Sequence, residues 1–176
     1  MRERARNRWL ALLALVASAA LGCARRHPDH DGRWVADAER RHALADQQLQ
    51  AGDLPGARAS LRAIVDTRAP GEIPAGVRRT VLQDTYFRLA ELDLKGNDPR
   101  AALATADRGL AIGSAADLDD LFVANLLVVR GAAHEALDDG AGAAADYHAA
   151  LVINDRLLAE TLRGGADAAG APGGRP

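Results

Sequence analysis

Apolar and small residues recur at helical spacing in six stretches of the chain between Trp34 and Leu162. Steps of three and four residues place such positions on one face of an α-helix. No stretch shows the apolar–polar alternation that is typical of a half-buried strand. The pattern therefore predicts an all-α domain with six helices, over about 34–50, 54–65, 77–95, 99–113, 115–137 and 142–162.

Short turns divide the predicted helices into three pairs, so we expect three antiparallel helical hairpins. The turns are Ala51-Gly52-Asp53, Gly96-Asn97-Asp98-Pro99 and Asp138-Asp139-Gly140. Glycine after a helix permits the left-handed backbone that ends it, and an aspartate caps the next helix. A hairpin repeated in tandem is too thin to bury its own apolar face, so neighbouring hairpins are expected to stack.

Three other segments have a distinct local pattern. Residues 69–76 hold two prolines and two glycines, which predicts a break between hairpins. Ser114-Ala115-Ala116-Asp117 is similar to a capping box and predicts a helix start. Residues 163–176 are rich in glycine, alanine and proline with little to bury, which predicts a disordered tail.

The composition indicates a core of closely packed helices. Apolar residues make up 48% of the chain, which is enough for a core, but alanine dominates them and aromatic residues are only 3%. The 176 residues leave room for one domain, which we place at residues 34–162.

The amino-terminal residues have the pattern of a secretory signal peptide. Arginines crowd the first eight residues, and a short apolar run follows from Trp9 to Leu21. This run is shorter than the roughly 20 apolar residues that span a bilayer. We therefore expect residues 1–22 to be an export signal that is removed from the mature protein.

The sequence Ala20-Leu21-Gly22-Cys23 at the end of this segment resembles the lipobox of bacterial lipoproteins. The resemblance implies that Cys23 is the first mature residue and carries a diacylglyceryl group and an amide-linked acyl chain such as palmitate. Residues 23–33 would then form a flexible tether. Ala24 follows the cysteine in place of the aspartate that retains lipoproteins in the inner membrane, which implies the outer membrane and its periplasmic face. Cleavage after Ala17-Ser18-Ala19 is the alternative, and it leaves a soluble exported protein with one thiol.

The predicted hairpins resemble tetratricopeptide repeats, which have small residues where two helices cross. The matching small residues are Ala45, Ala90 and Gly131 in the first helices, and Ala57, Ala102 and Ala143 in the second. The larger positions of the second helices fall on Leu61, Ala106 and Tyr147, followed by Ile64-Val65, Gly109-Leu110 and Ala150-Leu151. The resemblance implies a short solenoid of about three repeats. An unrelated six-helix bundle remains the alternative, because 44 residues separate Gly52 from Gly96 whereas the family period is 34.

The same resemblance implies a concave groove, lined by the first helix of each hairpin, that holds an extended peptide or a partner helix. The groove positions that match are His42, Asp46, Leu49, Asp84, Phe87, Glu91, Asn125, Val128 and Glu135. These include several carboxylates and no lysine or arginine, with Lys95 at the edge, so we expect a neutral or basic partner from the cell envelope.

Charge and motifs exclude several classes of function. Removing residues 1–22 takes away four arginines and one glutamate, so the net charge falls from -2 to about -5. A mildly acidic body argues against nucleic-acid binding. The chain has no G-x-S-x-G, H-E-x-x-H or phosphate-loop motif, so we expect no catalysis, cofactor or metal.

Three functional hypotheses follow from these patterns. The first is a non-catalytic lipoprotein scaffold that binds an envelope protein. The second is a structural or self-assembling subunit, because Leu157, Leu158 and Leu162 form an apolar edge near the end of the last helix. The third is an enzyme with an unrecognised site, which would need a pocket of convergent ionisable groups.

Overall fold

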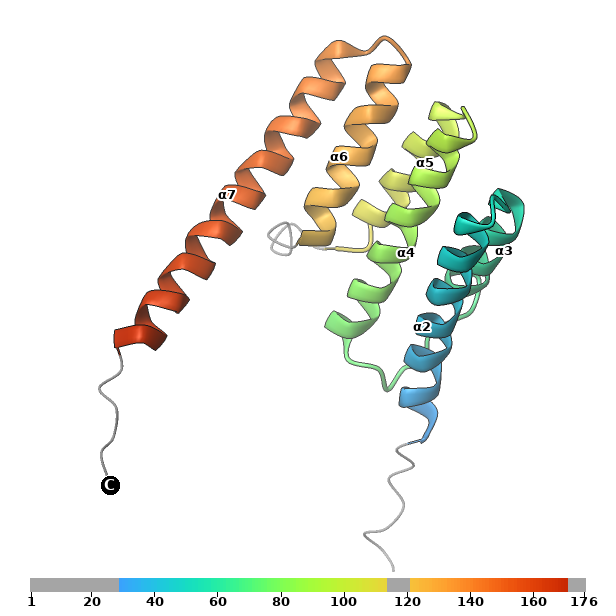
Figure 1. Cartoon of the computed structure of the whole chain (residues 1–176), viewed down its shortest axis with the longest axis horizontal. Coiled ribbons are helices and arrows are strands. Elements are labelled where there is room, and N and C mark those ends of the chain that lie inside the picture. The colour runs from blue at the N-terminus through green and yellow to red at the C-terminus, as the bar shows by residue number, and fades with distance from the viewer. Residues whose placement is uncertain (1–28, 114–120, 171–176) are drawn as a thin grey trace, which may run out of the picture.

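A computed structural model describes residues 29–113 and 121–170 of the chain, and these residues form an all-α fold (Figure 1). The helices are α2 (Asp29–Gln50), α3 (Leu54–Val65), α4 (Ala75–Lys95), α5 (Pro99–Leu110), α6 (Leu121–Ala136) and α7 (Gly140–Gly170). The prediction of six helices and no strand is confirmed for the described ranges.

The helices pair in chain order and the pairs pack side by side. α2 packs on α3, α4 on α5 and α6 on α7, and a short turn connects the two helices of each pair. Neighbouring pairs meet where α3 contacts α4 and where α5 contacts α6, and α4 also contacts both α2 and α6. Figure 1 shows the helices of each pair running in opposite directions. This arrangement is consistent with a helical repeat fold.

The three turns share one backbone design. A residue in the left-handed region ends the first helix of each pair: Gly52 (φ 78°), Asn97 (φ 57°) and Asp138 (φ 61°). The next residue is an aspartate whose backbone N–H donates to a carbonyl five residues earlier, over 2.8 to 2.9 Å. Its side chain then accepts the N–H of the residue three positions on, at 2.9 to 3.0 Å. One aspartate therefore closes one helix and caps the next.

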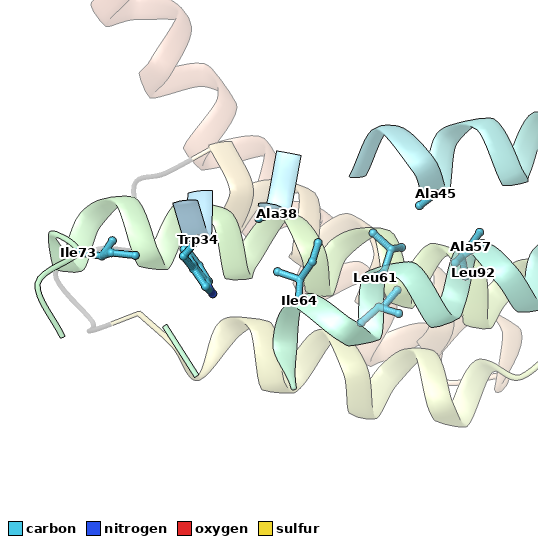
Figure 2. Packing of buried hydrophobic residues seen from close by; sticks show 9 residues of the cluster. Trp34, Ala38, Ala45, Ala57, Leu61, Ile64, Ile73 and Leu92 are labelled. Carbon is cyan, nitrogen blue, oxygen red and sulfur yellow. The ribbon is translucent and has the colours of Figure 1, made fainter. Parts of the chain in front are cut away.

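Small residues at the helix crossings allow the close approach that the sequence predicts. Ala45, Ala57, Ala90 and Ala102 are each at most 1% exposed. Larger side chains fill the space between the hairpins. Figure 2 shows Trp34 of α2 with Leu61 and Ile64 of α3 in the first cluster of the core. Two further clusters continue the core through α4, α5 and α6 and then through α6 and α7.

Buried polar groups join the two helices of each hairpin at matching positions twelve residues apart. Ser60 Oγ lies 2.7 Å from the side-chain amide of Gln48. Thr105 Oγ1 donates to Asp93 Oδ2 at 2.8 Å, and Asp93 also accepts from Arg58 of the preceding hairpin. In the last hairpin, Asp146 occupies the matching position and lies 3.9 Å from the His134 ring. Each of the three hairpins therefore has a polar contact between its two helices at the same position.

Both ends of the helical region extend beyond the predicted boundaries. α2 begins at Asp29, within the predicted tether, and α7 continues to Gly170, within the predicted tail. A glycine inside a helix costs only about 1 kcal/mol, so Gly32 does not end α2. Alanines flank the glycines of the tail, and alanine has the highest intrinsic preference for the helix. The predicted capping box at 114–117 lies outside the described residues.

Candidate binding groove

Two neighbouring cavities lie along the first helices of the hairpins. The first has a volume of about 270 Å³ and is lined from α2 and α4, with Leu61 of α3 at its base. The second has a volume of about 320 Å³ and is lined from α4 and α6. Phe87, Glu91 and Lys95 line both cavities, so one face of α4 forms the ridge between them. Together the cavities form a groove that crosses α2, α4 and α6, which we call the A-helix groove.

An ion-pair network occupies one wall of the first cavity. Arg88 Nη1 donates to Asp46 Oδ1 of α2 at 2.8 Å, and Arg88 Nε donates to both oxygens of Asp84 at 3.2 Å. The expectation of a groove without arginine is therefore wrong, because Arg88 lines the first cavity and pairs with two of its carboxylates. With Arg88 included, the charged groups that line the cavity carry a formal charge of -1: Asp46, Asp84, Glu91, Arg88 and Lys95.

His42 joins α2 to α4 behind this network. The Thr85 hydroxyl donates to the Val81 carbonyl at 2.7 Å, and its oxygen lies 2.9 Å from His42 Nε2, within hydrogen-bond distance. The other ring nitrogen lies 3.5 Å from Asp84 Oδ2. Burial lowers the pKa of His42 below its ordinary value, although the negative charge of Asp84 acts in the opposite direction. His42 therefore serves to join the two helices.

The second cavity has a more apolar lining. Phe87 and Leu94 of α4 face Val128, Val129 and Ala132 of α6 across it, with Glu91, Lys95 and Asn125 as its polar groups. Val128 is 44% exposed although it is a large apolar residue. Glu91 and Lys95 have no ion-pair partner among the described residues. This half of the groove thus offers apolar surface beside one free charge of each sign, which suits an amphipathic segment.

The structure brings together seven of the nine groove residues predicted from the sequence. Asp46, Leu49 and Asp84 line the first cavity, Asn125 and Val128 line the second, and Phe87 and Glu91 line both. His42 and Glu135 line neither cavity. Glu135 accepts a hydrogen bond from Tyr147 Oη of α7 at 3.0 Å, so its side chain contacts α7 and does not line the groove. Cys23 and residues 1–22 lie outside the described residues.

The sequence interpretation missed Arg88 and Leu94 as groove residues. Arg88 follows Asp84 by four residues, a spacing that places opposite charges side by side on a helix. That signal was present in the sequence. Leu94 is only partly buried, because it lies at the margin of the core beside the second cavity.

The chain matches no protein-family model and none of the curated proteins. Within the described ranges, no helix combines the length and apolarity needed to cross a bilayer. The function is therefore inferred from the groove and from the sequence alone.

Proposed function

We propose that the protein is a membrane-anchored lipoprotein of the cell envelope that binds a peptide or helix of another envelope protein in the A-helix groove. The binding role rests on one observation above all: two cavities share the ridge formed by Phe87, Glu91 and Lys95. Two adjacent cavities, one on each side of this ridge, offer contacts to an extended segment that crosses α4, whereas a single pocket would favour a small molecule.

The lining of the groove supports a partner with a particular chemistry. Phe87 lines both cavities and Val128 lines the second, and large apolar side chains of a partner that pack against them would contribute much of the affinity. Asp46, Asp84 and Arg88 are already paired with one another and offer little to a ligand. Among the described residues of the groove, Glu91 and Lys95 are the charged groups without an ion-pair partner. A neutral or weakly basic segment with one or two large apolar side chains fits this set.

Photo-crosslinking in cells tests the binding role. A photoreactive phenylalanine analogue at Phe87 is expected to capture one discrete protein. The same analogue at Ala104, which is exposed on α5 away from both cavities, should not capture it. Val128→Asp should abolish the capture from Phe87, because it places a charge in the apolar half of the groove without removing a buried contact. Equal capture from both positions would count against the groove.

Cys23→Ser tests the membrane anchor separately. If Cys23 carries acyl chains, mass spectrometry of the mature protein will show them on a chain that begins at Cys23, and the variant will lose both the lipid and the membrane association. A mature chain that begins at Ala20 with a free thiol would instead support the soluble exported form.

A further inference from the structure

Helix α7 carries a stripe of exposed apolar side chains, which we call the α7 stripe. It consists of Tyr147, Leu151, Leu158 and Leu162, which are 37%, 56%, 58% and 66% exposed. Spacings of four, seven and four residues place them on one face of the helix. Leu151, Leu158 and Leu162 point away from the face that Ala150 and Ile153 bury against α6. The ring of Tyr147 lies at the edge of the stripe, beside Gly131 of α6, and its hydroxyl donates to Glu135.

The stripe occupies positions that the other hairpins use to pack against their neighbours. Counted from the left-handed residue of each turn, Tyr147 matches Ala106 of α5, and Leu151 matches Leu110. Ala106 and Leu110 pack against Leu126 of α6 in the next hairpin. In the second hairpin, the matching surface of α5 packs against α6. The third hairpin leaves this surface of α7 exposed, and its shape is suited to packing against another α-helix.

The second half of α7 extends past its partner α6, as Figure 1 shows. Packing between the two helices ends near Leu157, and every residue from Leu158 to Arg163 is exposed. An isolated helix of about a dozen residues is marginal in water. A partner that covers Leu158 and Leu162 would stabilise this part of the helix.

We infer that the α7 stripe pairs with the α7 stripe of a second copy of the chain, antiparallel about a two-fold axis. The spacing of the stripe is symmetric about the point between Asn154 and Asp155. In an antiparallel pair, Leu151 therefore meets Leu158 of the second copy, and Tyr147 meets its Leu162. A two-fold interface requires this self-complementarity, because each contact must occur twice.

The residues at the centre of the stripe are suited to a two-fold axis. Asn154 and Asp155 are both exposed, and in this register Asn154 of one copy lies opposite Asp155 of the other. The amide can donate to the carboxylate, and the same bond forms twice. A polar pair within an apolar seam penalises shifted alignments and so fixes the register of two helices.

Head-to-tail stacking, with α2 of a second copy against α7, is disfavoured by the surface of α2. Among its described side chains, Glu39, Arg40 and Gln47 are exposed. Leu44, at 45% exposed, is the only large apolar residue that is strongly exposed among the α2 side chains whose burial is described. α2 therefore offers no apolar stripe to match the one on α7, and its charges would lose water on burial.

Sedimentation equilibrium of the full chain with Cys23→Ser, in a mild detergent, tests the dimer. The parent chain is expected to be a dimer, and Leu158→Glu a monomer that retains the helical circular dichroism of the folded hairpins. Leu44→Glu is the matched control, because it charges an equally isolated leucine on α2, and it should remain a dimer. A monomeric parent chain would overturn the inference. So would a dimer that persists in Leu158→Glu, for example through the apolar residues of the amino-terminal segment.

Cysteine crosslinking in the same Cys23→Ser background tests the antiparallel arrangement. Tyr147→Cys and Leu162→Cys chains should form a disulfide when mixed, because these positions face each other. Neither variant should crosslink by itself, since identical positions would lie about 22 Å apart along the helix pair. Crosslinking of each variant with itself, and none in the mixture, would indicate a parallel pair and contradict the proposed interface.

Discussion

Arg130 on α6 donates two hydrogen bonds to Asp146 on α7, from Nη2 to Oδ1 at 2.6 Å and from Nε to Oδ2 at 2.8 Å. Its remaining nitrogen donates to Asp107 on α5 at 2.9 Å. One guanidinium thus joins two hairpins. The hydrogen bonds to Asp146 raise the pKa of Arg130 above its ordinary value, so this group stays charged at any pH at which the protein is folded.

We expect Arg130→Met to lower the free energy of unfolding by about 3 kcal/mol. The substitution leaves the Asp146 carboxylate, whose side chain is 7% exposed, without its bidentate partner. Asp107→Ala is the control, because the Asp107 side chain is 50% exposed, and it should cost less than about 1 kcal/mol. Urea denaturation measures both values. An equal loss of unfolding free energy in the two variants would mean that the buried Arg130–Asp146 pair contributes no more than the exposed Arg130–Asp107 pair.

Gly109 and Gly131 each lie where two helices approach closely, and we expect alanine at the two positions to change stability by different amounts. A Cβ at Gly109 would lie 2.7 Å from a methyl of Leu126, which is fully buried, and 2.9 Å from Tyr86 Cβ. A Cβ at Gly131 would lie 2.7 Å from the ring of Tyr147, which is 37% exposed and can shift toward solvent at the cost of one exposed hydrogen bond to Glu135. Alanine also favours the helix by about 1 kcal/mol at either position.

We therefore expect Gly109→Ala to destabilise the protein by about 1–3 kcal/mol and Gly131→Ala to be close to neutral. Thermal denaturation of the two variants measures the difference. The reverse order would show that α6 approaches α7 more rigidly than it approaches α5.

Replacing Gln83 by methionine should stabilise the protein. Gln83 is 0% exposed, and both polar atoms of its side chain lack a hydrogen-bond partner in the described part of the chain. A buried amide without a partner costs about 1–3 kcal/mol, and methionine fills a similar volume without that cost. Gln48→Met should instead destabilise the protein, because the Gln48 amide is bonded to Ser60. Chemical denaturation of both variants tests this contrast.

The burial of His42 makes stability depend on pH in one direction. The folded state lowers the pKa of His42, so the unfolded chain binds more protons just below the ordinary histidine pKa. The contribution of neutral His42 to the free energy of unfolding is fully present above the ordinary histidine pKa. It declines as the pH falls below that pKa. Asp84 and Asp46 reduce the effect and Arg88 increases it.

We expect the wild-type chain to lose more stability than His42→Gln when the pH is lowered from about 7.5 to about 5.5. Glutamine is a suitable replacement, because its amide can also form a hydrogen bond with Thr85. Urea denaturation at the two pH values gives the comparison. An equal pH dependence in both proteins would exclude His42 as its source.

Local chemistry explains which features the sequence revealed. Asp53 and Asp98 are predicted as helix caps, and both accept the expected backbone N–H. A capping residue acts within four positions along the chain, so its role can be read from its neighbours. Gly52 is predicted from the same local rule, whereas Asn97 and Asp138 adopt the left-handed backbone without being glycine.

The sequence by itself determined the helices, their pairing and the positions of the small residues, because each depends on a few neighbouring residues. Only the tertiary structure decided which charges remain free in the A-helix groove. Arg88 reaches Asp46 across 42 residues of sequence, and His42 reaches Thr85 across 43. Such contacts depend on how far one hairpin is rotated against the next, and that rotation is set by the packing of the whole core.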